Sequence, residues 1–254
     1  MRSDDSFVDR PPCRKCGDPR SPDCGIPEPW CRDCARKFPD EWRQVLAEYV
    51  ADHGSGYLEE MGVPKAYRCC SFANFEVSTK ELQRVLRTVE TWAKDGSIGL
   101  YLCGDVGLGK THLAVGALLA MRARGRHGWY VSAQEFLLEC RDSFRSESGL
   151  QPILDEYSAH RVLVLDDLGS ENSTEFARET LGTLVDRAYR NRRPQLIVTS
   201  NLDLQGLAAK LDARIADRLI ELCQAVKLTG VSYRQQRAAQ RAIDRTRPAT
   251  WKVQ

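Results

Sequence analysis

Residues 104–111 read Gly104-Asp105-Val106-Gly107-Leu108-Gly109-Lys110-Thr111. This stretch fits the pattern G-x-x-x-x-G-K-[ST], in which glycines let a short loop wrap around a phosphate and turn its backbone N–H groups toward the anion. An apolar, strand-like run precedes it at residues 98–103, and a run with helical spacing follows at 111–124. The N-terminus of that helix adds partial positive charge at the same point. The sequence therefore predicts a phosphate-binding turn between a strand and a helix.

Every residue from Gly104 to His112 is a candidate for the lining of a nucleotide site. Lys110 supplies a full positive charge for the β- and γ-phosphates of ATP, and Thr111 supplies a hydroxyl for Mg²⁺. The alternative is a glycine-rich turn that carries a lysine by chance, and the flanking strand and helix argue against it. ATP and Mg²⁺ are therefore the expected ligands.

Four strand-like apolar runs and a weaker fifth are separated by segments with helical spacing. The apolar runs are 98–103, 129–132, 162–165, 196–200 and 225–229. The helical segments are 78–95, 111–124, 133–144 and 175–190. Strands that alternate with helices indicate an α/β fold, in which a mostly parallel sheet carries helices on both faces.

Polar residues end two of these buried runs. Asp166 and Asp167 follow the run at 162–165, and Asn201 follows the run at 196–200. Ligands of open α/β sheets bind at the carboxyl ends of the strands. We therefore expect Asp166 to hold Mg²⁺, directly or through water, and Asp167 to orient or deprotonate the attacking water. Asn201 would reach the γ-phosphate or the water, and its alternative role is to cap the helix that follows.

Ten cysteines occur in the chain, and half of them lie in the first 34 residues. Cys13 with Cys16, and Cys31 with Cys34, form two C-x-x-C pairs. Two such pairs can give four thiolates to one tetrahedral Zn²⁺, in a closed site that holds a fold and performs no chemistry. Cys24 lies between the pairs and is a spare cysteine that could replace one ligand. The alternative is a set of reduced thiols in an unfolded arm.

The composition is that of a soluble globular chain, with 42% hydrophobic and 28% charged residues and a net charge of +2. No apolar run approaches the ~18 residues that cross a bilayer, and no apolar signal segment begins the chain, so we expect a cytoplasmic protein without a membrane partner. Three parts are predicted: a zinc-binding module with its linker over 1–58, an ATPase domain over 59–238 and a flexible tail over 239–254. Within the first part, a short helix over 38–50 should end before a break at 52–56.

Seven short stretches in a fixed order resemble the AAA+ ATPases of the DnaC/IstB type, which are helicase loaders of bacteria and phages and transposition helper ATPases. The stretches are 62–67, 72–75, 104–113, 164–169, 199–202, 213–219 and 230–234. The resemblance covers about residues 62–236 and is more specific than the phosphate loop alone. It implies a five-stranded parallel sheet of order 5-1-4-3-2 with a reduced or divergent lid.

The resemblance also implies roles for several polar residues. Asn201 corresponds to the sensor after the fourth strand, and Arg234 to a second sensor. An arginine finger is implied within residues 213–219, where Arg218 is the first candidate and Arg214 the second. Without the resemblance, these two arginines, four residues apart, would be read as a solvated helix face.

One residue departs from the wider AAA+ pattern. Many AAA+ enzymes carry glutamate after the metal-binding aspartate, whereas this chain carries Asp167. Loaders of the type that the chain resembles commonly share this pair of aspartates. The shorter carboxylate must still reach the attacking water.

The resemblance and the cysteine-rich segment together predict a helicase loader. The zinc module would hold the replicative helicase, while ATPase domains in a homo-oligomer would grip single-stranded DNA. One alternative is a transposition helper, which binds duplex DNA, recruits a transposase and usually has a short helical N-terminus. Another is a zinc-dependent DNA-binding module with a degenerate ATPase, and the presence of Lys110, Thr111 and Asp166 argues against it.

Overall fold

Five parallel strands form the central sheet of the computed structural model, which describes residues 15, 37, 39–143 and 149–238. The strands are β1 (Gly99–Cys103), β2 (Gly128–Ser132), β3 (Val162–Asp166), β4 (Gln195–Ser200) and β5 (Cys223–Lys227). Their order across the sheet is β2-β3-β4-β1-β5, and every neighbouring pair is parallel. This is the predicted order read from the opposite edge, so the predicted α/β fold is confirmed.

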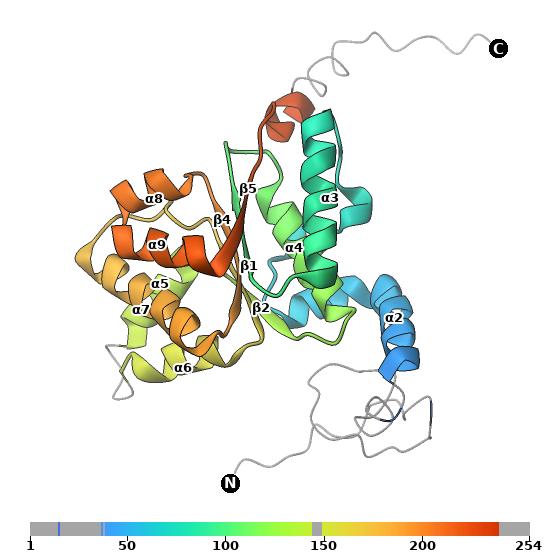
Figure 1. Cartoon of the computed structure of the whole chain (residues 1–254), viewed down its shortest axis with the longest axis horizontal. Helices are drawn as coiled ribbons and strands as arrows, with labels where there is room; N and C mark the ends of the chain where they lie inside the picture. Colours follow the sequence, from blue (N-terminus) through green and yellow to red (C-terminus); the bar gives the residue numbers. More distant parts are fainter. Residues whose placement is uncertain (1–14, 16–36, 38, 144–148, 239–254) are drawn as a thin grey trace, which may run out of the picture.

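Helices cover both faces of the sheet (Figure 1). One face carries α2 (Pro39–Glu60), α3 (Lys80–Asp95) and α4 (Lys110–Arg122), and the other carries α5 (Ala133–Ser143), α6 (Gln151–Ala159), α7 (Glu175–Asn191), α8 (Leu204–Lys210) and α9 (Ala213–Leu222). Two short 3-10 helices, Lys65–Tyr67 and Phe72–Asn74, connect α2 to α3. In the part of the chain that the structure describes, no helix is long and apolar enough to cross a membrane.

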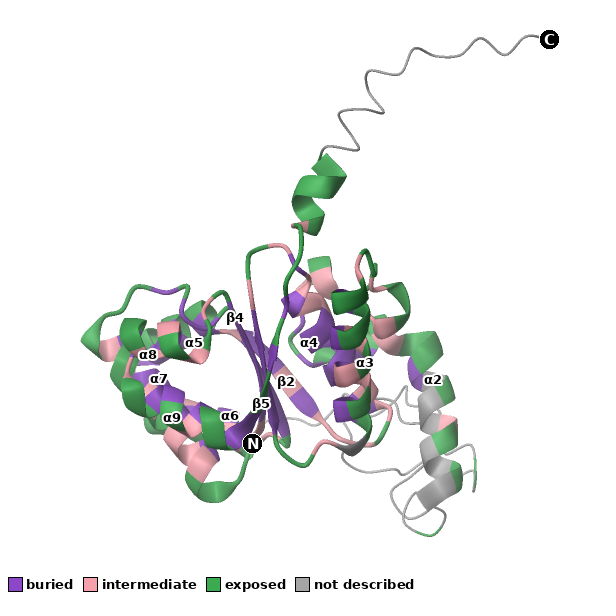
Figure 2. Cartoon of the chain, turned by 45° about the horizontal axis from the view of Figure 1, so that its top comes forward, coloured by how far each residue is buried: buried purple, intermediate pink, exposed green. Residues whose placement is uncertain are grey.

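Side chains of each strand alternate between two apolar cores, one on each face of the sheet. Leu100 and Leu102 belong to the core beneath α3 and α4, whereas Tyr101 and Cys103 belong to the core beneath α5, α7 and α9. The helices are correspondingly buried on their inner sides and exposed on their outer sides (Figure 2). Burial on both faces explains why the strands appear in the sequence as continuous apolar runs.

The predicted helix over 78–95 illustrates how local sequence sets an element. The Thr79 side chain accepts a hydrogen bond from the backbone N–H of Leu82 at 3.1 Å and caps α3. Apolar residues on one face of that helix are buried, including Val89 and Trp92. The indole N–H of Trp92 donates to the carbonyl of Ile98 at 3.0 Å, which ties the end of α3 to the start of β1.

The break expected at residues 52–56 appears as a kink. α2 runs from Pro39 to Glu60, but two helical segments meet at His53, whose backbone angles are not helical (φ −117°, ψ 15°), and the helix resumes after it. The second half of α2 packs into the core, because Tyr57 and Leu58 are buried. This packing overrides the weak helix propensity of two glycines and a serine. The zinc-ligand candidates, Cys24 and the predicted tail over 239–254 all lie outside the described residues.

Candidate nucleotide-binding site

The loop between β1 and α4 forms a cradle that only glycine can build. Gly107 and Gly109 have φ angles of 81° and 89°, in the left-handed region. A Cβ atom on Gly107 would lie 2.2 Å from the hydroxyl oxygen of Ser232, and one on Gly109 would lie 2.6 Å from the ring of Phe75. The loop can therefore approach its neighbours closely and turn its N–H groups into one concavity, which is the geometry of an anion nest.

Lys110, the first residue of α4, is buried in this loop. Its Nζ donates hydrogen bonds of 2.8 Å to the carbonyl of Gly104, the carbonyl of Asp105 and the Oδ1 of Asn201. Burial lowers the pKa of this ammonium, while the nearby carboxylates of Asp167, Asp166 and Asp105 act in the opposite direction. The predicted lysine and the predicted sensor are thus in direct contact.

Asp166 ends β3 and is surrounded by hydroxyl donors. Its Oδ2 accepts hydrogen bonds from Thr111 at 3.2 Å and from Tyr130 at 2.7 Å, and its Oδ1 accepts one from Thr199 at 2.6 Å. Burial raises the pKa of Asp166, and the three hydroxyls oppose that shift because they stabilise the carboxylate. The carboxylate is therefore held in one orientation beside the first turn of α4.

Thr111 and Asp166 fit Mg²⁺ by their chemistry. A hydroxyl and a carboxylate are oxygen donors of the kind that Mg²⁺ prefers, and Mg²⁺ usually takes only one or two protein ligands beside the phosphates of a nucleotide. Their oxygens lie 3.2 Å apart, next to the glycine cradle. The two residues predicted as metal ligands are thus placed where a bound triphosphate would need them.

Asp167 and Asn201 line the pocket beside the glycine cradle. Asp167 has a φ of 55°, and its backbone N–H donates to the Thr199 hydroxyl at 2.9 Å, which fixes the turn after β3. The alternative role of Asn201 as a helix cap is wrong, because Asp203 caps α8 by accepting a hydrogen bond from the N–H of Gly206.

A pocket of about 370 Å³ joins these groups. Its lining includes the residues from Val106 to His112 together with Asp167, Asn201 and Arg234. It also includes apolar and aromatic side chains, from Tyr67, Phe75, Leu82, Val231 and Tyr233. A lining that combines charged and glycine residues with apolar side chains suits both the phosphates and the base of a nucleotide.

Residues after β5 close one side of this pocket. The N–H of Tyr233 donates to the carbonyl of Gly107 at 2.9 Å, and the Tyr233 hydroxyl donates to Glu76 at 2.9 Å. These contacts place the following residue, Arg234, in the pocket lining. The predicted second sensor therefore reaches the site of its own chain.

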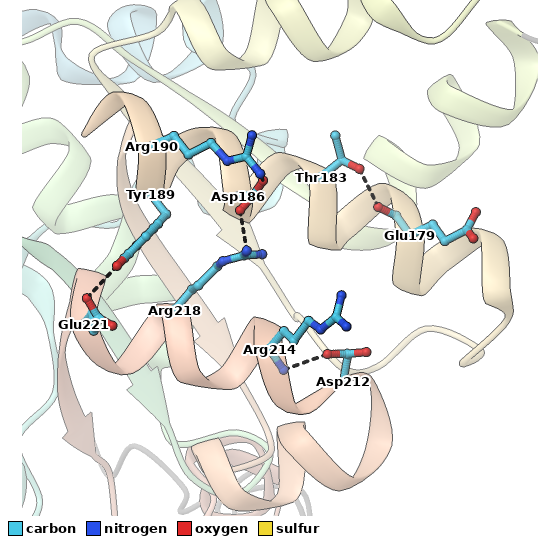
Figure 3. A network of polar contacts seen from close by, with 9 residues as sticks. All are labelled: Glu179, Thr183, Asp186, Tyr189, Arg190, Asp212, Arg214, Arg218 and Glu221. Carbon is cyan, nitrogen blue, oxygen red and sulfur yellow. Dashed lines mark hydrogen bonds and ion pairs between the residues drawn. The ribbon is translucent and has the colours of Figure 1, made fainter.

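The two arginine-finger candidates are elsewhere. Arg214 and Arg218 lie on α9, which faces α7 on the opposite side of the sheet from α4 (Figures 1 and 3). Both line a second groove, of about 630 Å³, which shares no lining residue with the nucleotide pocket. The structure thus brings together all the predicted site residues that it describes except these two.

Sequence reasoning missed several residues of the site. Tyr130 contacts Asp166, Thr199 bridges Asp166 and the N–H of Asp167, and Phe75 and Tyr233 line the pocket. Tyr130 lies in a buried strand, where a tyrosine is normally a packing residue, so no local pattern could have indicated its contact. Phe75 is about 30 residues from the loop that it contacts, and only the fold brings it there.

Comparisons with known proteins find related sequences and folds. A segment of 162 residues, 62% of this chain, is 25% identical to the replicative helicase loader DnaC of Escherichia coli (strain K12) and covers 66% of that protein, just under two thirds of its length. The crystal structure of the DnaC helicase loader superposes with a TM-score of 0.61 at 24% identity, over 65% of this chain and 100% of that one. The crystal structure of DnaI superposes with a TM-score of 0.58 at 26% identity, over 66% of this chain and 96% of that one.

The family model described as IstB-like ATP binding protein matches residues 57–241. That range contains the whole sheet, the glycine cradle with Lys110, the Asp166 cluster and the residues after β5 that close the pocket. With the fold, the site and the family model in agreement, the chain belongs to the family of IstB-like ATP-binding proteins.

Proposed function

We propose that this protein is an ATPase that loads a replicative helicase onto single-stranded DNA and acts as a homo-oligomer in the cytoplasm. The observation that carries the ATPase part is the convergence of Lys110, Thr111 and Asn201 on one pocket beside the glycine cradle, where Thr111 is hydrogen-bonded to Asp166. The likeness to proteins named as replicative helicase loaders supports the loader part.

Each residue of the pocket has a distinct role in the proposed reaction. The loop N–H groups and Lys110 bind the phosphates, and the oxygens of Thr111 and Asp166 hold Mg²⁺. When bound, Mg²⁺ neutralises charge on the phosphates. Asp167 orients or deprotonates the attacking water, and Asn201 links that water to the lysine end of the site.

Two arginines complete the proposed reaction from different chains. Arg234 acts on the nucleotide of its own chain, because it lines the pocket. Arg218 acts on the nucleotide of a neighbouring subunit, since it lies in a separate groove on the opposite side of the sheet. A finger supplied in trans stabilises charge in the transition state and makes hydrolysis depend on assembly.

The loader role is tested by binding and by DNA specificity. The full-length protein, immobilised, should retain the replicative helicase of its own organism in an ATP-dependent manner and should bind single-stranded DNA more tightly than duplex DNA. The alternative is a transposition helper, and the match to the IstB-like family model is consistent with that role as well. Preference for duplex DNA together with failure to retain the helicase would establish that alternative and overturn the loader.

The zinc module is tested by metal content. We expect about one Zn²⁺ per chain, bound by Cys13, Cys16, Cys31 and Cys34. The double substitution Cys13→Ser and Cys16→Ser should release the zinc and abolish helicase binding. It should leave the affinity for ATP unchanged, because the pocket is lined by residues 66–236. The matched control is Cys24→Ser, which should keep the zinc. Elemental analysis of the purified variants measures their zinc content. Equal zinc in the double variant and in Cys24→Ser would contradict the ligand assignment.

Tyr130 offers a test of the metal end of the site. Tyr130→Phe removes a buried 2.7 Å hydrogen bond to the oxygen of Asp166 that also faces Thr111. We expect ATP binding to weaken about ten- to a hundredfold when Mg²⁺ is present, which is the usual effect of losing a partner that orients a metal ligand, and to stay unchanged in EDTA. Calorimetric titration in both buffers measures the difference.

Tyr101→Phe is the matched control for this substitution. It removes the same hydroxyl from a buried tyrosine of the sheet, but that hydroxyl donates to the carbonyl of Leu202 at 2.8 Å, away from Asp166. Its ATP affinity should have the wild-type dependence on Mg²⁺. An equal Mg²⁺-dependent loss in both variants would show that Tyr130 contributes only to packing.

A further inference from the structure

Helices α7 and α9 hold Arg218 in a defined place (Figure 3). The Nη2 of Arg218 lies 2.6 Å from the Oδ1 of Asp186, a residue of α7. The other carboxylate oxygen of Asp186 lies 2.7 Å from Arg190, one helical turn further along α7. Asp186 therefore bridges two guanidinium groups and pairs one of them across the interface of the two helices.

The two arginines that share this carboxylate differ in exposure. The side chain of Asp186 is 19% exposed and that of Arg218 is 29% exposed, whereas that of Arg190 is 73% exposed. An ion pair between exposed side chains contributes little, but a partly buried pair is less screened and more strongly oriented. The ion pair with Asp186 thus restricts the side chain of Arg218 more than it restricts the exposed side chain of Arg190.

A tyrosine on α7 adds a second restraint. The guanidinium carbon of Arg218 lies 5.9 Å from the centre of the Tyr189 ring, within the range of a cation–π contact. The hydroxyl of Tyr189 donates to Glu221 of α9 at 3.0 Å, which fixes the ring. Arg214 shows a different pattern: its side chain is exposed, and its backbone N–H donates to the Oδ1 of Asp212 at 2.6 Å.

We infer that Asp186 is a positioning residue for Arg218, and this inference rests on the proposed function. A guanidinium has five N–H donors in a rigid fork. The ion pair with Asp186 holds the guanidinium at Nη2 and leaves its other N–H groups for an anion supplied by another subunit. Because the side chain is already ordered, less rotamer freedom is lost when Arg218 meets the phosphates of the neighbouring chain.

Mixing two inactive full-length variants tests the inference. Arg218→Ala subunits keep an intact nucleotide pocket but lack the finger, and Lys110→Ala subunits cannot hydrolyse but can donate Arg218. An equimolar mixture should regain ATP hydrolysis at the interfaces where Arg218 of one subunit meets the pocket of the other. The decisive donor is Lys110→Ala with Asp186→Asn. We expect it to restore about tenfold less hydrolysis, because Arg218 loses the charged partner that holds it in place.

The hydrolysing subunit, Arg218→Ala, is the same in every mixture, so a lower rate of ATP hydrolysis is assigned to the donor subunit. The matched control donor is Lys110→Ala with Arg190→Ala, which removes the exposed partner of Asp186 and should restore hydrolysis to within about twofold of the plain donor. In an otherwise wild-type chain, Asp186→Asn should keep the wild-type affinity for ATP. It should also keep the wild-type size of the assembly by light scattering.

The outcomes distinguish the proposed role of Arg218 in trans from the positioning role of Asp186. If the plain Lys110→Ala donor restores nothing, hydrolysis in trans and the role of Arg218 in the proposed function are wrong. If the plain Lys110→Ala donor and the donor that also carries Asp186→Asn restore hydrolysis equally, Asp186 does not position Arg218. If the Asp186→Asn donor fails together with assembly, Asp186 supports the packing of α7 on α9 and the inference is overturned.

Discussion

Replacing Lys110 with alanine should reduce ATP hydrolysis about a hundred- to a thousandfold, the usual effect of removing one preorganised donor from an active site. The substitution removes the only full positive charge among residues 104–111. It also removes the donor of three 2.8 Å hydrogen bonds, to Gly104, Asp105 and Asn201. The loop and the sensor thereby lose the group that joins them.

Phosphate release by the purified full-length protein measures this effect, with Lys94→Ala as the control. Lys94 lies exposed in the last turn of α3 and is absent from the pocket lining, so its loss should leave the rate within about twofold of wild type. Equal rates for wild type and Lys110→Ala would support the reading of the chain as a zinc-dependent DNA-binding module with a degenerate ATPase.

Replacing Leu137 with alanine should lower the free energy of unfolding by about 2–5 kcal/mol. Leu137 is 6% exposed and belongs to the core between the sheet and α5, α6 and α7, together with Phe136 and Tyr157. The rings of Phe136 and Tyr157 pack edge to face at 5.0 Å. These rings cannot move far enough to fill the space left by the leucine, so the substitution leaves a cavity.

The neighbouring residue provides the matched control. Leu138 is 49% exposed on the same helix, so Leu138→Ala makes the same chemical change outside the core and should alter stability by no more than about 0.5 kcal/mol. Urea unfolding followed by circular dichroism measures both variants. Similar midpoints for the two would contradict the placement of α5 on the sheet.

The strands and the phosphate loop could be predicted because their signals are local. A strand buried on both faces is a continuous apolar run, and the loop needs glycine, lysine and threonine at fixed spacing. Asp166 and Asn201 could be placed at one edge of the sheet because the carboxyl ends of parallel strands meet there. The predicted sheet order came from the resemblance to a known family, because the spacing of apolar residues does not specify the order of the strands in a sheet.

Contacts between distant segments could not be predicted. Tyr130 meets Asp166 across two neighbouring strands, and Asp186 meets Arg218 across two helices. In both pairs, each partner alone has an ordinary role, in core packing or on a charged helix face. The kink of α2 at His53 lies in the predicted break, but the helical segment after it was not predicted, because Gly54 and Gly56 are poor helix formers and the burial of Tyr57 could not be read from the sequence.

The packing of α2 after its kink has a mechanical consequence. Gly54 lies against Leu119 of α4, and the guanidinium of Arg122 in α4 lies 4.6 Å from the centre of the Tyr57 ring. Helix α4 begins at Lys110. A shift of the segment after His53 is therefore transmitted through α4 to the phosphate loop. The kink at His53 is the joint at which the preceding part of α2 can change direction without moving that segment.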